Sequence, residues 1–463
     1  MAGISGGTNP IAVIDANPMS VRQWVVVVLM MFLNALDGFD VLSSALASAG
    51  FSKDWGMNSS ALGWVLGADL IGMGFGSIFL GSLADKIGRK PTMLICLLIM
   101  AIGMYAAAAL ATGPQPMFFI RLVTGIGIGG MLAATNAVTA ETTSSASRSL
   151  AMALYVIGYP LGGTIGGFAA QLWLLKVHDW HAVFMFGAVC TAVMIPLVAL
   201  LVPETPAFHA ARQKPDALAR INRSLRALMQ PAIDALPQIK AGLQPKVSDI
   251  LSKPGLRKVT WLLALGYMVH TFTFYYVLKF AVKIVSDAGY TQPEAASTLT
   301  WANIGGAIGG FLFGFLLKKW DIKGPAIACM VLGAGAVAYF GMGHDTLNYW
   351  RLSTFLQMFF LNAAIVGFYA AFARGFPAYA RATGTGFALG IGRAGAAGSP
   401  IVAGYLFTAF GGTGTEKGHL IAHLMPVSLV MTIGSLVGVV LLLMLPLRDA
   451  DRDLFETPQS KVA

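Results

Sequence analysis

The chain has 463 residues, of which 56% are hydrophobic and only 11% charged, and its formal net charge is +10. A soluble domain carries about 25% charged residues, so this composition excludes an ordinary aqueous globule and predicts a protein that has the lipid bilayer as its solvent. In a membrane protein the positive charge indicates basic connections on one side of the bilayer rather than nucleic-acid binding. The three cysteines lie far apart in apolar stretches, which predicts neither a disulfide framework nor a metal site.

Apolar stretches of roughly 20 residues, the length that crosses a bilayer as a helix, occur twelve times along the chain. The predicted spans cover 23–47, 61–81, 91–112, 116–140, 149–173, 181–202, 258–283, 294–317, 325–343, 350–373, 383–408 and 425–447. We therefore expect an all-α integral membrane protein with two six-helix halves, residues 1–203 and 258–463. A polar, amphipathic linker, residues 204–257, would join them.

Lysine and arginine are distributed unevenly over the predicted connections. Most of them fall on the side that bears the N-terminus, including Arg22, the 86–90 cluster and the basic residues of the linker. Because positively charged connections stay in the cytoplasm, we expect both termini to be cytoplasmic. The predicted location is a bacterial-type inner (plasma) membrane.

The first span, WVVVVLMMFLNALDGFDVLSSALA (24–47), contains two carboxylates, Asp37 and Asp40. Residues three apart are neighbours on one helix face, and an ionised acid at the centre of a span costs about 2.5–3.5 kcal/mol. Two such charges destabilise each other, a property suited to a group that binds and releases a proton. Gly38 between them would let a ligand approach the backbone. A purely structural acid pair is the alternative.

Two arginines also fall within predicted spans. Arg121 lies at a depth comparable to that of Asp40, so we expect it to pair with an aspartate of the first helix; an arginine reaching to the membrane surface is the alternative. Arg393 lies near the middle of its span among small residues, GIGRAGAAGSP (390–400). Its guanidinium would bind a substrate carboxylate through two parallel hydrogen bonds. The alternative is an ion pair with a buried acid such as Asp69.

A repeat relates the two halves. GSLADKIGRK (81–90) is followed 233 residues later by GFLLKKWDIK (314–323), and both segments end in a basic cluster. The same offset places His270 of the seventh span where the first span has Asp37, so His270 would contact the ligand or bind a proton. Phe272, Tyr275 and Tyr276 follow closely and would stack on a ring. Core packing is the alternative for all four.

Three motifs resemble those of a known family. GSLADKIGRK (81–90) is similar to the signature loop of the major facilitator superfamily, RLVTGIGIGG (121–130) to its helix 4 motif, and VPETP (202–206) to the motif after helix 6. More narrowly, DGFD (37–40), Glu141 and the segment 381–404 together resemble the aromatic acid:proton symporters.

This resemblance implies a fold of twelve helices in two pseudo-symmetric halves and a conformational switch at the signature loop. The switch would comprise Gly81, Asp85, Gly88, Arg89 and Glu141. Asp85 would dock at the start of the eleventh span, and Arg89 would pair with Glu141.

The function that follows is proton-coupled import of a small aromatic carboxylate by alternating access. Asp37, Asp40 and Arg121 would handle the proton, and Arg393, His270, Phe272, Tyr275 and Tyr276 the substrate. The expected protein is monomeric, is not an enzyme, binds no nucleic acid, and needs no cofactor beyond the proton gradient. The alternatives are a symporter of another organic anion, a drug/proton antiporter, a receptor and a membrane enzyme.

The roles of three further charged residues stay open at this point. Asp69 of the second span would either assist protonation or pair with Arg393. Lys279 and Lys283, near the end of the seventh span, would anchor the helix at the membrane surface by reaching outward, or attract anions.

Overall fold

The computed structural model describes residues 9–212, 215–236, 247–252, 254–317, 319–376, 381–411 and 419–446. Within these ranges all regular secondary structure is helical, which confirms the predicted fold class. The two chain ends and part of the predicted linker, residues 237–246, lie outside the described residues.

Helices occupy every predicted span. They are α2 (Val21–Asp54), α3 (Ser59–Ile87), α4 (Arg89–Ala109), α5 (Pro114–Thr142), α6 (Ser145–Ala169) with its continuation η1 (Ala170–Leu174) and α7 (Leu175–Val177), α8 (Trp180–Leu201), α12 (Pro254–Asp287), α13 (Gln292–Leu316), α14 (Lys323–Gly341), α15 (Leu347–Gly375), α16 (Arg381–Gly411) and α18 (Leu424–Met444). Five short helices are α1 (Pro10–Ala16), α9 (Pro206–Arg212), α10 (Ala217–Ala227), α11 (Val247–Ser252) and α17 (His419–Ala422).

Among the described residues, 11 helical segments are long and apolar enough to cross a membrane. The twelfth predicted span corresponds to α16, which has 31 residues. Its many glycines and Arg393 lower its mean hydropathy, although its length of roughly 46 Å at 1.5 Å per residue exceeds the thickness of the hydrocarbon core.

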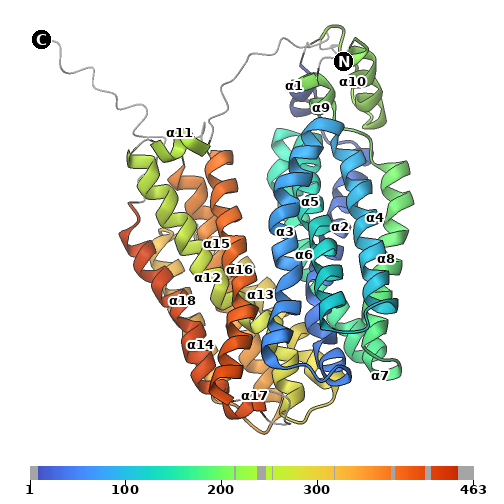
Figure 1. The fold of residues 1–463 in the computed structure, drawn as a ribbon. Coiled ribbons are helices and arrows are strands. Elements are labelled where there is room, and N and C mark those ends of the chain that lie inside the picture. The colour runs from blue at the N-terminus through green and yellow to red at the C-terminus, as the bar shows by residue number, and fades with distance from the viewer. Residues whose placement is uncertain are drawn as a thin grey trace, which may run out of the picture. The chain divides into compact units, whose positions relative to one another are not determined.

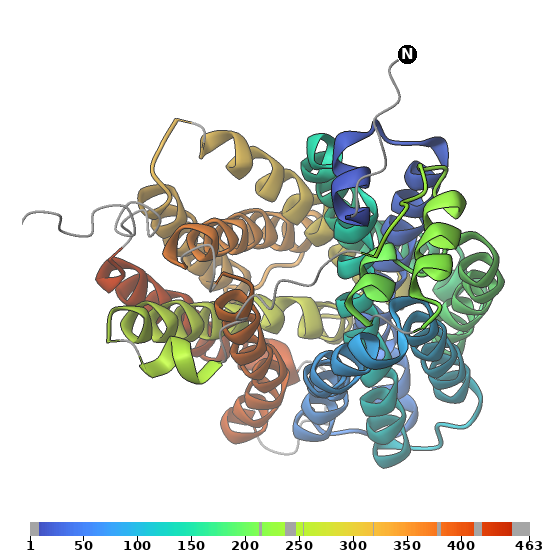
Figure 2. The same cartoon turned by 90° about the horizontal axis from the view of Figure 1, so that it is seen from above.

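The chain forms two compact units, residues 1–47 with 68–241, and residues 48–67 with 242–463. In each unit the long helices run alongside one another (Figure 1), and Figure 2 shows them end-on. Within the second unit, the start of α3 packs on α16, where the hydroxyls of Ser60 and Thr408 are 2.7 Å apart. The units therefore differ from the predicted halves in the placement of residues 48–67.

The predicted repeat is present in the helix bounds and in the packing. The helices α12, α13 and α15 begin 233 residues after α2, α3 and α5 respectively. In the first unit, a Cβ added to Gly72 would collide with the carbonyl oxygen of Leu122. The same offset leads to Gly305 and Phe355 in the second unit, where an added Cβ would collide in the same way. Both copies therefore join their second and fourth long helices by one backbone-to-backbone contact.

A second glycine contact joins α2 and α6. Added Cβ atoms at Gly158 and Gly162 of α6 would collide with backbone carbonyls of α2, and one at Gly38 would collide with the carbonyl of Tyr159. Small residues at such spacing let membrane helices approach closely. The neighbour of Gly38 is therefore the backbone of α6, and the expectation that a ligand approaches the backbone there is wrong.

Candidate functional site

Arg121 of α5 lies at the centre of a buried polar group in the first unit. Its guanidinium forms an ion pair of 3.0 Å with Asp69 of α3, and both side chains are 0% exposed. It also donates to the backbone carbonyl of Asp40 at 2.6 Å and to the sulfur of Met104 at 3.1 Å. The acidic partner is thus Asp69 and not, as expected, a carboxylate of the first helix, which Arg121 reaches through the backbone. Complete burial also rules out an arginine that extends to the membrane surface.

Asp37 and Asp40 are both fully buried in α2. The carboxylate of Asp40 faces α8, because one of its oxygens would be 3.1 Å from a Cβ added to Gly187. Among the described residues this carboxylate has no hydrogen-bond partner, although Arg121 and Asp69 both act on it electrostatically. Asp40 and Asp69 therefore share one arginine, and this group of three contains one more carboxylate than it has cations.

The repeat shows that these charges occur in one copy only. At the offset of 233 residues, the counterparts of Asp40, Asp69 and Arg121 are neutral in the second unit, namely Thr273, Ala302 and Thr354. The same packing of long helices thus carries a charged group in the first unit and none at the matching positions of the second.

Arg393 lies half-buried on α16 in the second unit. A Cβ added to its neighbour Gly392 would collide with the ring of Tyr267 on α12, and Arg393 is within electrostatic range of that tyrosine. Tyr267 in turn packs edge-on against Phe372 at 5.5 Å, and its hydroxyl is 3.4 Å from that of Tyr369. Sequence reasoning missed Tyr267, although its position one helical turn before His270 could have indicated it.

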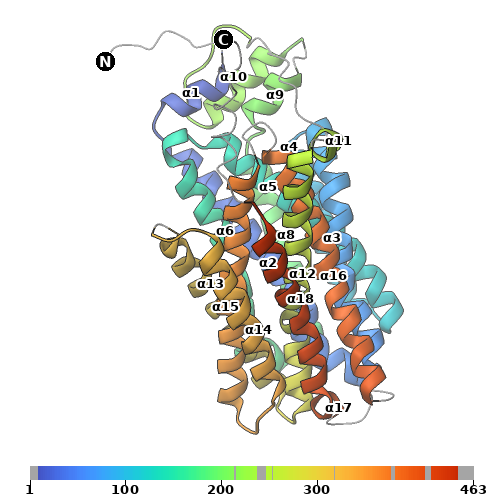
Figure 3. The same ribbon diagram turned by 90° about the vertical axis from the view of Figure 1, so that its left-hand side faces the viewer.

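The residues predicted on α12 divide into two groups. His270 is fully buried, with Nδ1 3.0 Å from the Ser435 hydroxyl and Nε2 3.0 Å from the Leu361 carbonyl oxygen. The hydroxyl of Tyr276 is likewise 3.0 Å from that of Ser428. Both side chains are engaged with α15 or α18 (Figure 3), as the core-packing alternative expected.

Phe272 and Tyr275 are half-buried and are the predicted aromatic residues of α12 that keep exposed surface. Lys279 is fully buried, so the expectation that it anchors the helix at the membrane surface is wrong. Lys283 is half-buried.

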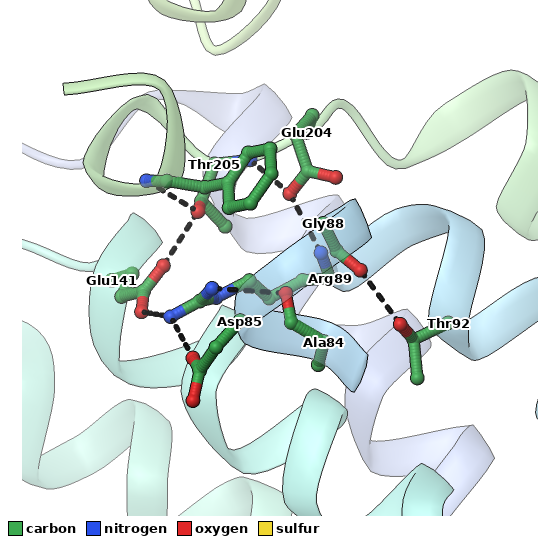
Figure 4. A network of polar contacts seen from close by, with 9 residues as sticks. Ala84, Asp85, Gly88, Arg89, Thr92, Glu141, Glu204 and Thr205 are labelled. Atoms are coloured by element: carbon green, nitrogen blue, oxygen red, sulfur yellow. Dashed lines mark hydrogen bonds and ion pairs between the residues drawn. The ribbon is translucent and has the colours of Figure 1, made fainter. Parts of the chain in front are cut away.

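The signature loop forms a polar network in the first unit (Figure 4). Arg89 pairs with Glu141 at 3.0 Å, as expected, and with Asp85 at 3.1 Å. The side chain of Asp85 is 74% exposed. Its docking at the start of the eleventh span, next to residues 377–380 outside the described part of the chain, stays a prediction.

Glu204 and Thr205, from the VPETP segment, complete this network, and sequence reasoning assigned them no role. The carboxylate of Glu204 accepts hydrogen bonds from the backbone N–H groups of Arg89 at 3.0 Å and Lys90 at 3.2 Å, which caps α4. Burial raises the pKa of Glu204, and hydrogen bonds from the N–H groups of Thr205, Arg89 and Lys90 partly oppose that rise. Thr205 donates its hydroxyl hydrogen to Glu141 at 2.5 Å.

Gly88 has a conformation that requires glycine, and Gly81 does not. The φ angle of Gly88 is +116°, and a Cβ there would collide with the Glu204 carboxylate. A Cβ at Gly81 would meet only Ala133, at an ordinary distance of 3.5 Å. The two glycines of the loop therefore have different structural roles.

Comparison with known proteins agrees with this architecture. The family model of the Major Facilitator Superfamily matches residues 27–350. The gallate transporter of Pseudomonas putida is 29% identical over 84% of this chain and 87% of its own length. The 4-hydroxybenzoate transporter PcaK of the same organism is 27% identical over 83% and 86%.

A solved structure of a bacterial homologue of the human lysosomal transporter Spinster has the same fold. It covers 92% of this chain and 96% of its own, with a TM-score of 0.69 at 17% identity. The match of a family model to most of the chain, the all-helical fold and the repeat agree, and the chain belongs to the major facilitator superfamily.

Proposed function

We propose that this protein imports a small aromatic carboxylate together with a proton by alternating access. The observation that carries the proposal is the arginine shared by two carboxylates, Arg121 with Asp69 and Asp40. Relatives named as gallate and 4-hydroxybenzoate transporters support the substrate class.

The proton binds at the carboxylate that lacks a hydrogen-bond partner in the described structure, Asp40. An ionised carboxylate in an apolar interior is costly in free energy, and Arg121 already pairs with Asp69. A proton on Asp40 removes the surplus negative charge. Its release leaves two carboxylates to compete for one guanidinium, which favours a rearrangement of α2, α3 and α5. Asp37, three residues from Asp40, belongs to the same proton-handling site.

The substrate binds at Arg393. A guanidinium holds a carboxylate by two parallel charge-assisted hydrogen bonds, and the aromatic side chains of Tyr267, Phe272 and Tyr275 offer faces for a ring. The absence of charge at the repeat-related positions of the second unit supports this division, with the proton handled in the first unit and the anion in the second.

The signature loop controls which state is populated. Asp85 and the Arg89–Glu141 pair latch the two halves in the outward-open state, and the latch opens when the halves rock. The protein works as a monomer in the inner membrane, with both termini in the cytoplasm and the proton gradient as its energy source.

Uptake into proteoliposomes tests this function. Labelled 4-hydroxybenzoate and gallate should accumulate when the interior is alkaline and only equilibrate when the pH gradient is collapsed. Asp40→Asn should keep exchange of labelled for unlabelled substrate and lose accumulation. Asp54→Asn, an exposed acid of the same helix, is the control and should accumulate normally. Accumulation that ignores the pH gradient would overturn the proposal.

A further inference from the structure

The first unit contains a cavity that the transport cycle above does not use. It has a volume of about 540 Å³ and lies where α8 ends, between that end, the starts of α2 and α4, and the linker helix α10. Its lining includes four basic side chains, Arg22, Lys90, Arg220 and Arg223. Leu200 of this cavity is sixteen residues along α8 from Phe184, the ring beneath Arg121, so the two sites are roughly 24 Å apart at 1.5 Å per residue.

The charge of this cavity is positive, and part of it is not balanced by protein acids. Arg220 pairs with Asp216 at 2.6 Å, and the Glu204 carboxylate accepts hydrogen bonds from the N–H groups at the start of α4. Within the part of the chain that the structure describes, neither Arg22 nor Arg223 forms a hydrogen bond or an ion pair. Two guanidinium groups thus line the cavity without an acidic partner, an arrangement that favours an anion.

The helix directions add to the positive potential. Arg22 lies in the first turn of α2 and Lys90 in the first turn of α4. The N-terminal end of a helix carries a partial positive charge and favours anions. Cations placed at two helix starts therefore make an anion between them more favourable still.

The mouth of the cavity borders the surface that faces lipid. Leu200 is 78% exposed, and α8 continues this exposed apolar stripe through Leu197, Val193 and Val189. The linker helix α10 is amphipathic, with Ile221 and Leu225 fully buried and Arg220 and Arg223 exposed. In Figures 1 and 3, α10 lies with α9 at the end of the first unit, beyond the long helices.

We propose that this cavity binds a phosphate ester anion, the headgroup phosphate of an anionic phospholipid, held by Arg22 and Arg223. Arginine matches phosphate oxygens with its planar fork, and basic pockets beside membrane helices recognise such headgroups. The lipid chains lie along the exposed stripe of α8. Free inorganic phosphate offers the same chemistry without the chains, and the test separates the two sources.

Thermal unfolding of the purified full-length protein in detergent micelles tests the site. Phosphatidylglycerol should raise the melting temperature in a saturable manner, and phosphatidylcholine at equal mole fraction should not. Inorganic phosphate alone should have little effect. Stabilisation by phosphate as strong as that by phosphatidylglycerol would keep the anion site and replace the lipid by free phosphate as its source.

The variants are Arg22→Gln and Arg223→Gln, each of which should raise the half-saturating amount of phosphatidylglycerol roughly fivefold. Arg226→Gln is the matched control, because this exposed arginine lies on the same helix outside the cavity lining. Equal weakening by Arg223→Gln and Arg226→Gln would show general charge attraction and overturn the proposal. Equal stabilisation of the unaltered protein by phosphatidylcholine would overturn it as well.

Discussion

An ion pair of 3.0 Å joins Arg121 to Asp69, and both side chains are completely buried in the first unit. Removing one partner of a buried pair leaves an uncompensated charge and costs about 3–5 kcal/mol. We therefore expect Arg121→Met to lower the free energy of unfolding by that amount, measured by denaturation in detergent micelles.

The control for this substitution is Arg148→Met. Arg148 pairs with Asp15 at 2.6 Å, but the two side chains are 37% and 31% exposed, and pairs of this kind contribute roughly 0–1 kcal/mol. Equal losses in the two variants would contradict the importance of burial at Arg121.

Arg393→Lys should weaken substrate binding. Lysine keeps the charge but cannot form two parallel hydrogen bonds with a carboxylate, and a hydrogen bond to a charged group contributes about 1.5–3 kcal/mol. We expect the apparent KM for an aromatic carboxylate to rise at least about tenfold, with a smaller change in maximal rate. Arg374→Lys, at an exposed pair with Asp321, should leave KM unchanged. An unaltered KM in Arg393→Lys would count against the carboxylate contact.

Gly88→Ala and Gly81→Ala should differ, although both change a glycine of the signature loop. At Gly88 the φ angle of +116° is strained for alanine and the methyl group collides with Glu204; such strain costs on the order of 1–3 kcal/mol. At Gly81 the methyl group makes an ordinary contact of 3.5 Å. Melting temperatures should fall for Gly88→Ala and stay nearly constant for Gly81→Ala, and the reverse order would refute this assignment.

Glu204 should make stability depend on pH. Burial raises its pKa from the ordinary value of 4.5, so the folded state binds the proton more tightly than the unfolded chain does. The stabilisation linked to that proton is complete below pH 4.5 and is lost as the pH rises through the raised pKa. The melting temperature of the unaltered protein relative to Glu204→Gln should therefore decrease over that range. Parallel pH curves for the two proteins would disprove the linkage.

The sequence predicted the features that depend on local patterns. Runs of apolar residues are enough to place the long helices, and the spacing of the signature loop is enough to indicate the Arg89–Glu141 pair, which the structure contains. The repeat could be found because both copies keep the same helix starts.

Features that depend on how helices face each other could not be predicted. Arg121 and Asp40 lie at similar depth, but depth does not reveal which neighbouring helix a side chain meets, and the acid that pairs with Arg121 comes from α3. His270 occupies the repeat position of Asp37, yet its partners Ser435 and Leu361 are 165 and 91 residues away in sequence. Such contacts arise from packing between distant segments.

The glycine contacts between α2 and α6 have a mechanical consequence. Where Gly38, Gly158 and Gly162 bring the two backbones together, no side chain remains that could rotate and absorb a displacement. A tilt of α2 caused by a change of charge at Asp37 or Asp40 must therefore move α6 as well, so the pair acts as a stiff lever. Any larger residue at these three positions would act as a wedge, and we expect them to tolerate the least variation in the first unit.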